Sequence, residues 1–261
     1  PELLGLPDAE AASRASFAAV AVWWVAFSIP LFQRIEEPPV APSMKPRSAR
    51  VGEALRRLGG TLKELRRFRA AFLTMLAFLL YNDGIQTIIR MAAVFGAEVG
   101  IGRGTLIAAI LTVQLVGIPC TFAFGQLAAR IGAKRAVLLG VGVYALIAIV
   151  GWRMDSATEL WILAVLIGLV QGGTQALSRS LFASLIPKSR SSELFGLFAV
   201  FEKFAGIFGP ALFGLAVTLT GSSRDAILTV IAFFVTGGLL LARVDVAAGR
   251  QAARAADRAE R

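Results

Sequence analysis

Histidine is absent from the 261 residues of this chain, and cysteine occurs once, as Cys120. Without histidine, the chain lacks the commonest metal ligand and all histidine-based acid–base chemistry. A single cysteine cannot form a disulfide within the chain, and in its apolar stretch Cys120 is interpreted as a small packed side chain. We therefore expect no metal site, no cofactor and no disulfide framework.

Charged residues are also scarce. They make up 17% of the chain, hydrophobic residues make up 56%, and the mean hydropathy is +0.70. A soluble domain carries roughly 25% charged residues. The polar residues here are too few to give the folded chain a water-facing surface, so lipid must cover much of it. The composition predicts an integral membrane protein, with the lipid bilayer as its first partner.

Long apolar runs are abundant instead. A run of about 20 apolar residues crosses a bilayer as an α-helix. Such runs occur at residues 15–33, 70–95, 105–126, 136–153, 160–186, 194–219 and 226–243. The expected fold class is therefore an all-α membrane bundle of about seven transmembrane helices.

Positive charge gathers on one side of the predicted spans. The formal net charge is +10, and residues 34–69, 127–135, 187–193 and 243–261 hold 20 of the 27 Lys and Arg residues. The loops on the other side hold four, and basic loops remain in the cytoplasm. This asymmetry predicts a cytoplasmic C-terminus. It also accounts for the basic composition without nucleic acid, which we do not expect as a partner.

The longest loop, residues 34–69, contains a periodic segment. Its apolar residues recur every three or four positions, at Val51, Leu55, Leu58, Leu62, Leu65 and Phe68. This spacing predicts an amphipathic helix with a basic outer face, lying at the inner headgroup surface and interrupted at Gly59-Gly60. Binding of nucleic acid or of another partner by the charge run is the alternative. The tail, residues 244–261, is interpreted as a polar helix or a disordered segment.

The second span carries polar residues deep in the bilayer. At 1.5 Å per residue, Asp83 lies about 20 Å from Arg69, past the middle of a core about 30 Å thick. Asn-Asp-Gly favours a turn, so we expect a helix broken at residues 82–84, as at many membrane sites. A kink with Asp83 satisfied locally is the alternative. The candidate substrate- or ion-pathway residues here are Asn82, Asp83, Gln86 and Arg90.

The fifth and sixth spans carry the other embedded polar residues. Charges in a bilayer core cost about 2.5–3.5 kcal/mol each on insertion scales, so they are expected to pair or to line a cavity. Arg179 and Glu202 lie at similar depths, which predicts an ion pair, whereas Asp83 has no certain basic neighbour and is interpreted as a proton-exchanging carboxylate. The further candidate pathway residues are Gln171, Gln175, Arg179, Glu202 and Lys203.

Polar load divides the spans into two groups. The first, fourth and seventh spans are nearly free of polar residues, whereas the second, fifth and sixth carry most of them. We expect the first group to face lipid and the second to border a cavity. Glycines at positions 168, 172 and 173 are expected to let the fifth helix approach a neighbour closely, and interhelical hydrogen bonding alone is the alternative for its polar face.

One loop carries a more specific pattern. Residues 125–135 read Gly-Gln-Leu-Ala-Ala-Arg-Ile-Gly-Ala-Lys-Arg. This run resembles the signature cytoplasmic loop of the major facilitator superfamily, Gly-x-Leu-Ala-Asp-Arg-x-Gly-Arg-Lys. The matching positions are Gly125, Leu127, Ala128, Arg130, Gly132 and Lys134. Ala129 replaces the Asp of the family, so the gate-locking role of that Asp is in doubt here.

The resemblance implies an organisation by halves. If the loop is the second of the two copies in the family, the spans are helices six to twelve of a twelve-helix transporter. Residues 1–33 then hold the last helix of the N-terminal half, and 34–69 form the central cytoplasmic loop. Residues 70–243 form the C-terminal six-helix half, and 244–261 the cytoplasmic tail. The chain begins at Pro1, and we expect a missing N-terminal half of the same protein as its partner.

Three more runs narrow the resemblance. Residues 80–90, 96–100 and 171–180 resemble the vacuole-effluxer-like branch of the superfamily, which includes a fungal vacuolar amino-acid effluxer and bacterial members. The branch implies a small solute such as an amino acid, and efflux as one direction. It also implies the inner membrane of a bacterium as the location.

Secondary transport by alternating access, coupled to protons or another ion, is the function these features favour. No Gly-x-x-x-x-Gly-Lys-Ser/Thr motif is present to bind a nucleotide. A membrane-embedded enzyme would need a catalytic set, and the chain has neither histidine nor paired aspartates in its spans. A non-transporting receptor or scaffold on a transporter fold is the remaining alternative.

Overall fold

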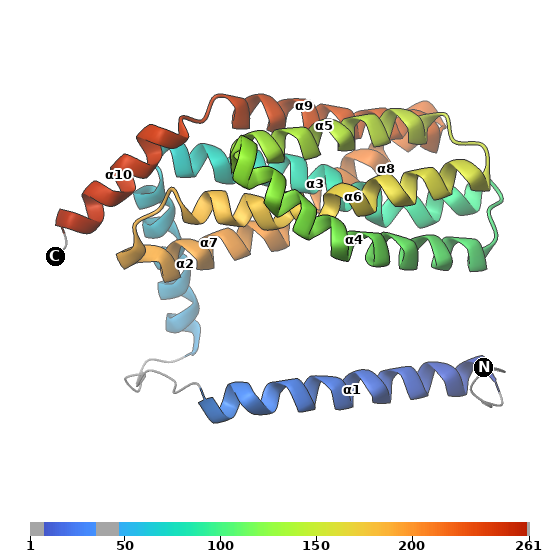
Figure 1. Ribbon diagram of the computed structural model, residues 1–261, viewed down its shortest axis with the longest axis horizontal. Helices are drawn as coiled ribbons and strands as arrows, with labels where there is room; N and C mark the ends of the chain where they lie inside the picture. Colours follow the sequence, from blue (N-terminus) through green and yellow to red (C-terminus); the bar gives the residue numbers. More distant parts are fainter. Residues whose placement is uncertain (1–7, 35–46, 260–261) are drawn as a thin grey trace. The chain divides into compact units, whose positions relative to one another are not determined.

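The structure, a computed structural model, describes residues 8–34 and 47–259. The described residues form helices and no strands: α1 Ala9–Arg34, α2 Arg47–Leu65, α3 Arg69–Glu98, α4 Arg103–Ile131, α5 Ala133–Trp152, α6 Ala157–Ala183, the short 3₁₀ helix η2 Lys188–Arg190, α7 Ser191–Phe204, α8 Phe208–Thr220, α9 Ser223–Ala242 and α10 Val246–Ala259 (Figure 1). The chain divides into two compact units, Pro1–Arg50 and Val51–Arg261. Each unit is described by itself.

Seven segments of the described chain are long and apolar enough to cross a membrane. They are α1, α3, α4, α5, α6, α9 and the segment Lys188–Thr220, which contains α7 and α8. The predicted all-α membrane fold with seven spans is therefore confirmed, and the sixth span consists of two helices rather than one.

The first unit contains α1, a helix of 26 residues. Its side chains are mostly exposed, including Trp23 and Trp24, and the rings of Trp23 and Phe27 lie 4.2 Å apart. Pro30 stands in the last turns without ending the helix. An apolar helix with so little packing inside its own unit needs lipid or another protein surface around it.

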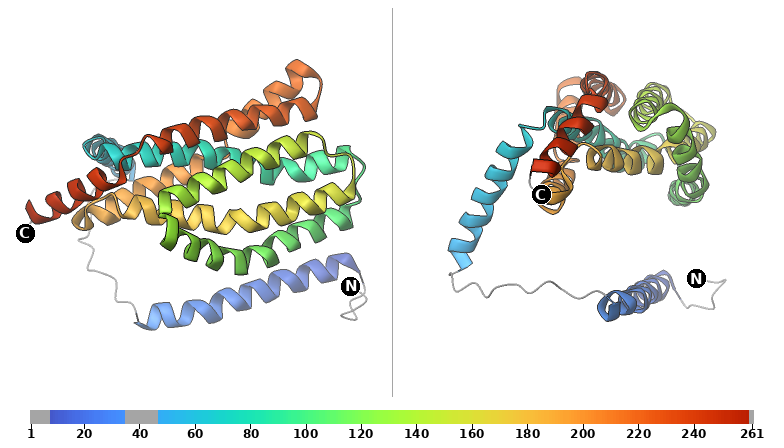
Figure 2. Two further views of the ribbon diagram at one scale, coloured as in Figure 1. Left: turned by 45° about the horizontal axis from the view of Figure 1, so that its top comes forward. Right: turned by 60° about the vertical axis from the view of Figure 1, so that its left-hand side comes forward.

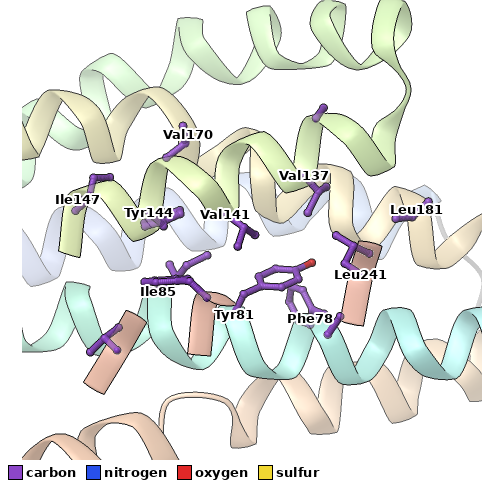
Figure 3. Close-up of a cluster of buried hydrophobic side chains, with 14 of the residues drawn as sticks. Phe78, Tyr81, Ile85, Val137, Val141, Tyr144, Ile147, Val170, Leu181 and Leu241 are labelled. Carbon is purple, nitrogen blue, oxygen red and sulfur yellow. The ribbon is translucent and has the colours of Figure 1, made fainter. Parts of the chain in front are cut away.

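In the second unit, α3 is the most buried span. It packs against α9, α8 and α6, while α5 lies between α6 and α9, and α4 lies against α6 (Figure 2). Aromatic side chains fill the centre: Phe78 of α3 stacks on Phe198 of α7 with ring centroids 4.6 Å apart, and Tyr144 of α5 stacks on Phe234 of α9 with ring centroids 5.6 Å apart. Figure 3 shows Phe78 and Tyr81 on α3 and Tyr144 on α5 within this core. The core is thus a layer of large side chains that α3 shares with α5, α6, α7 and α9.

Glycines set the closest helix crossings. A Cβ added to Gly172 would overlap the hydroxyl of Thr121, and one added to Gly168 would lie 3.0 Å from the carbonyl oxygen of Val113. At Gly173 an added Cβ would overlap the ring of Phe124. The expectation that these glycines allow close approach is confirmed, and the partner helix is α4.

Exposure differs strongly among the apolar spans of the second unit. The apolar helix α5 buries eight residues, whereas α4, which was not singled out, buries only Ala109 and Phe124. The exposed face of α4 is apolar and consists of Ile107, Ile110, Leu111, Leu115, Ile118 and Phe122. Helix α5 packs one face against α6 and α9 and exposes Leu139, Leu146 and Ile149 on another, so its lipid-facing role stays a prediction.

The basic loops gather at one end of the second unit, where α10 lies beside the start of α3. Here Arg190 pairs with Glu64 at 3.1 Å, and the carboxylate of Asp257 accepts hydrogen bonds from the backbone N–H and the hydroxyl of Ser189, both at 3.2 Å. The tail, left open between helix and disorder, is helical as α10.

Helix α2 differs from its expected form in two ways. It continues through Gly59 and Gly60 without a break. Its apolar residues Leu58, Leu62 and Leu65 pack against the core of the bundle, and Leu65 is fully buried. The last two turns of α2 therefore bury their apolar face against protein, because the chain turns directly into α3 there; the side chains of Val51 and Leu55 lie outside the described set.

Candidate functional site

Helix α3 is continuous through Asn82, Asp83 and Gly84, so the expected break at these residues is wrong. Asn82 and Asp83 are each only 2% exposed, and an added Cβ on Gly84 would lie 3.0 Å from the ring of Phe234. The weak helix propensity of Asn-Asp-Gly amounts to about 1 kcal/mol per residue at most. Close packing against α9 requires the small residue and keeps the helix intact.

The break lies in the sixth span instead. Helix α7 ends at Phe204 and α8 begins at Phe208, and Gly206 between them has a φ of +88°. This left-handed conformation is one that glycine adopts without steric cost. Residues 205–207 therefore form a sharp joint, three residues before Pro210, and the backbone groups freed there need partners.

Asp83 supplies one of these partners. Its Oδ1 accepts a hydrogen bond from the backbone N–H of Gly206, and its Oδ2 has no hydrogen-bond partner among the described groups. The first turn of α8 also approaches this point, since an added Cβ on Gly209 would lie 3.0 Å from the carbonyl oxygen of Asp83. A carboxylate is favoured here because the first N–H groups of a helix carry partial positive charge.

Arg90 supplies the second partner. Its Nη1 donates a hydrogen bond of 2.7 Å to the carbonyl oxygen of Gly206. Asp83 and Arg90 are seven residues apart, so they lie on one face of α3 two turns apart. Gln86 lies between them, 3.1 Å from the position of an added Cβ on Gly206. The sequence offered no certain basic neighbour for Asp83, and the structure supplies one: Asp83 holds the N–H and Arg90 holds the C=O of Gly206.

We call this arrangement the α3 clamp, formed by Asp83, Gln86 and Arg90 around Gly206. Three of the four predicted pathway residues on α3 converge on it. Asp83 is buried and Arg90 is exposed. The clamp therefore extends from the interior of the unit to its surface, and it contacts the joint of the sixth span at Gly206.

A second charged contact holds α7. The guanidinium of Arg179 on α6 pairs with the carboxylate of Glu202 on α7. The predicted contact is present, but its side chains are 52% and 27% exposed, so these are not the fully buried charges that the sequence suggested. Glu202 and Gly206 are four residues apart, so the ion pair and the α3 clamp hold α7 close to the same joint.

A neutral polar contact links α3 and α6 nearby. The hydroxyls of Tyr81 and Ser178 lie 2.6 Å apart, and the Ser178 hydroxyl is 2.6 Å from the carbonyl oxygen of Thr174. Neither side chain was among the candidate site residues predicted from the sequence. A tyrosine one position before Asn82 in a membrane helix was the available signal, because a buried phenol needs a partner.

The remaining predicted pathway residues are not part of the α3 clamp. Gln171 and Gln175 lie half-buried on α6, and the Oε1 of Gln171 is buried without a hydrogen-bond partner in the described part of the chain. Asn82 is buried, and Lys203 is exposed. In the described residues no group of three or more Cys, Asp and Glu side chains gathers in a way that could hold a metal ion.

The loop of residues 125–135 has a clear local geometry. Gly132 has a φ of +90°, which separates α4 from α5 by a single residue. Lys134 then reaches the end of α9, where its Nζ donates to the carbonyl oxygens of Ala242 and Val244 at 2.7 and 2.8 Å. A cation is favoured at these carbonyls because a helix C-terminus carries partial negative charge.

The other positions that match the signature loop have no such contact. Gly125 and Arg130 are exposed, and Leu127 is half-buried. An added Cβ at Gly125 would meet nothing within 4 Å. Within this unit the structural contributions of the loop therefore come from Gly132, which makes the turn between α4 and α5, and from Lys134, which binds the end of α9.

The bundle and its broken sixth span define an integral membrane protein of the major facilitator type. Residues 6–254 match the family model described as "Vacuole effluxer Atg22 like", and the chain belongs to that family. The resemblance found in the sequence is thus confirmed.

Known relatives agree with this assignment. The "Uncharacterized MFS-type transporter YxiO" of Bacillus subtilis strain 168 is 38% identical over 234 residues, covering 90% of this chain and 54% of the relative. "Autophagy-related protein 22-1" of Phaeosphaeria nodorum is 28% identical over 267 residues, covering 90% and 47%. "Autophagy-related protein 22" of Yarrowia lipolytica is 28% identical over 272 residues, covering 92% and 46%. The chain spans about half the length of these relatives.

Proposed function

We propose that this chain forms half of a secondary transporter that moves a small solute across a membrane by alternating access. Family membership, seven spans and charged residues around a helix joint support this function. Broken helices whose freed backbone groups meet polar partners are the usual sites of substrate and ion binding in such proteins. The relatives are about twice as long, which supports a second half that completes the site.

The α3 clamp is the observation that carries the proposal. Asp83 holds the N–H and Arg90 holds the C=O of the same residue, and Glu202 on α7 is tied to α6 by Arg179. Protonation of Asp83, or a solute group that competes for either charge, would loosen the hold on Gly206. Helix α7 could then tilt relative to α8, which would couple binding to rocking of the halves.

A zwitterion such as an amino acid suits this site as the solute. Its ammonium group would be attracted to Asp83 or Glu202, and its carboxylate to Arg90 or Arg179. The name of the family, vacuole effluxer, favours efflux as the direction. Protons are the proposed coupling ion, because Asp83 retains an oxygen without a hydrogen-bond partner.

The topology is part of the same proposal. Residues 1–33 would carry the last helix of the N-terminal half, 34–69 the central loop, 70–243 the C-terminal half and 244–261 the tail. The end of the bundle that holds Lys134, Arg190 and α10 would face the cytoplasm, because basic loops are retained there. The membrane would be the inner membrane of a bacterium.

Asp83→Asn tests the proposal in the full-length transporter. Asparagine keeps an acceptor for the Gly206 N–H but cannot carry the charge. We expect solute uptake driven by a pH gradient in proteoliposomes to fall to background, while folding and insertion are retained. Asp225→Asn, which changes an exposed aspartate in the first turn of α9, is the matched control and should transport normally.

Two outcomes would count against the proposal. Normal transport by Asp83→Asn with an unchanged pH dependence would remove the coupling role of the α3 clamp. Absence of transport by the unmodified full-length protein, across a panel of amino acids and other small solutes, would favour the receptor or scaffold on a transporter fold.

A further inference from the structure

A hollow lies at the basic end of the second unit, away from the α3 clamp. It has a volume of about 550 Å³ and is lined by the segment 67–70, the end of α9 and the start of α10. Three arginines line it: Arg67, Arg69 and Arg243. We call it the basic pocket. Neither the family assignment nor the proposed transport mechanism gives it a role.

The arginines of the basic pocket are exposed, and their charges are not paired with another described side chain. In the described part of the chain, no ion pair or side-chain hydrogen bond involves Arg67, Arg69 or Arg243. The pocket also contains Asp245, whose Oδ1 accepts a hydrogen bond of 3.0 Å from the N–H of Ala248 at the start of α10. Three positive charges therefore face one negative charge that is already engaged.

The pocket is polar at its rim and apolar below it. Arg69 and Arg243 stand at the ends of the membrane-spanning helices α3 and α9. Leu73 and Leu240 also line the pocket and lie about one turn further into these helices, roughly 4–6 Å deeper along the axis. Leu239, next to Leu240, is 56% exposed, as for a side chain in contact with lipid. The gradient from charge to hydrocarbon matches that of a phospholipid at the membrane interface.

The surrounding backbone does not oppose an anion. The carbonyl oxygens of Ala242 and Val244 would repel a phosphate beside Arg243, but Lys134 already donates to both. Its ammonium group also adds a fourth positive charge close to the pocket. The pocket is far larger than the roughly 30 Å³ that a water molecule occupies in the liquid, and a free phosphate would leave its apolar floor uncovered.

We infer that the basic pocket binds the phosphate headgroup of an anionic phospholipid, with the glycerol and upper acyl chain against Leu73 and Leu240. Basic pockets between transmembrane helices on the cytoplasmic side are suited to anionic headgroups, because the charges lie at headgroup depth and apolar residues lie below them. A bound lipid would bridge α3, α9 and α10, and so would fasten the tail helix to the bundle.

Native mass spectrometry of the complete chain in detergent tests this inference, with phosphatidylglycerol and phosphatidylcholine titrated separately. We expect one phosphatidylglycerol to bind per chain at concentrations where phosphatidylcholine does not. The triple variant Arg67→Gln, Arg69→Gln, Arg243→Gln should weaken this binding at least about tenfold, since each arginine contributes attraction near an anionic surface. The matched control Arg135→Gln, Arg254→Gln, Arg258→Gln removes as many exposed charges at the same end and should bind within about twofold of the parent.

A second variant separates loss of the site from loss of the fold. Ala248→Trp keeps every charge but places a large side chain from the exposed start of α10 into the pocket. It should also lose the bound lipid, while its melting temperature without added lipid stays close to that of the parent.

Three results would overturn the inference. The triple variant could bind phosphatidylglycerol like the parent, or Ala248→Trp could retain the lipid. Inorganic phosphate at millimolar concentration could displace the lipid completely, which would identify a free phosphate as the ligand of the pocket.

Discussion

Gly206 has a left-handed backbone conformation and little space around its Cα, and both features disfavour a residue with a side chain. Its φ of +88° lies in the left-handed region, and an added Cβ would stand 3.1 Å from the Nη2 of Arg90 and from the Cβ of Gln86. The left-handed conformation costs a residue with a Cβ roughly 1–2 kcal/mol. The crowding falls on the two side chains that complete the α3 clamp.

Gly206→Ala should therefore destabilise the protein by about 1–3 kcal/mol, from strain and from displacement of Arg90. Unfolding in mixed detergent micelles measures this change. Gly196→Ala on α7 is the control: an added Cβ there meets nothing within 4 Å, so replacing a helical glycine should be neutral or stabilising by up to about 1 kcal/mol. Equal effects of the two substitutions would show that the joint does not require glycine.

The Arg179–Glu202 pair belongs to the same scale. Because its side chains are 52% and 27% exposed, water screens the attraction wherever it reaches them. Glu202→Gln should lower stability, and adding Arg179→Gln should partly restore it. A double-mutant cycle should give a coupling of about 0.2–1 kcal/mol. A double variant whose loss equals the sum of the single losses would show that the pair contributes no stability.

Helix α10 is held at both ends by contacts with the bundle. Near its start, Gly249 is buried, and an added Cβ there would overlap Ala70 at the start of α3. Near its end, Asp257 receives hydrogen bonds from Ser189 of η2. The backbone N–H groups of Lys188 and Ser189 hold the pKa of the Asp257 carboxyl below its usual range. This helix is therefore docked through an acid-sensitive contact.

The sign of the pH dependence follows from that lowered pKa. A lowered pKa means that the folded state binds the proton less readily than the unfolded state, whose aspartate titrates near about 3.9. The contact is fully present above that pH and is lost as the pH falls through the lower folded value. Hydrogen exchange of the last turns of α10 should be constant from pH 7 to 5, after correction for intrinsic rates, and faster below about pH 4.

Asp257→Asn is the control for this prediction. It should exchange at these turns at one corrected rate across the whole range, because asparagine does not titrate. Acid-dependent exchange that persists unchanged in Asp257→Asn would assign the effect to another group.

At the scale of the whole molecule, the proposed second half carries a prediction of its own. If the solute site lies between two halves, residues 1–261 reconstituted alone should not accumulate solute above protein-free liposomes. A longer protein that contains both halves should do so under the same gradient. Transport by the 261-residue chain as a monomer would contradict the two-half arrangement, and transport only as a homodimer would replace the second half with a second copy.

The sequence predicted the spans well because membrane helices follow a simple length rule, and each long apolar run became a helix or a helix pair. The Arg179–Glu202 contact was also within reach, since depth along a helix follows from a fixed rise per residue. The α3 clamp was not. Gly206 lies 123 residues from Asp83, and whether the two face each other depends on how α3 and α7 are rotated.

Local helix propensity also led to the wrong position for the helix break, which was predicted at residues 82–84 and lies at residues 205–207. Asn-Asp-Gly weakens an isolated helix, and the glycines before Pro210 gave an equally good signal for a bend in the sixth span. Packing decided between them, because Gly84 fits against Phe234 within a straight helix, whereas Gly206 has the freedom to turn. Single-sequence patterns identify which residues could bend, and the tertiary contacts decide which of them do.

The joint at Gly206 also has a consequence for synthesis. Helices α7 and α8 contain 14 and 13 residues, so each is about 20 Å long and too short to cross a core of about 30 Å. The two must enter the bilayer together, as a folded-over pair or as one temporary straight helix. At 5–20 residues per second, Gly206 emerges roughly 6–25 s after Asp83. During that interval the aspartate must remain in the nascent bundle without the amide that it later holds, which leaves Arg90, on the same helix, as its nearest available counter-charge.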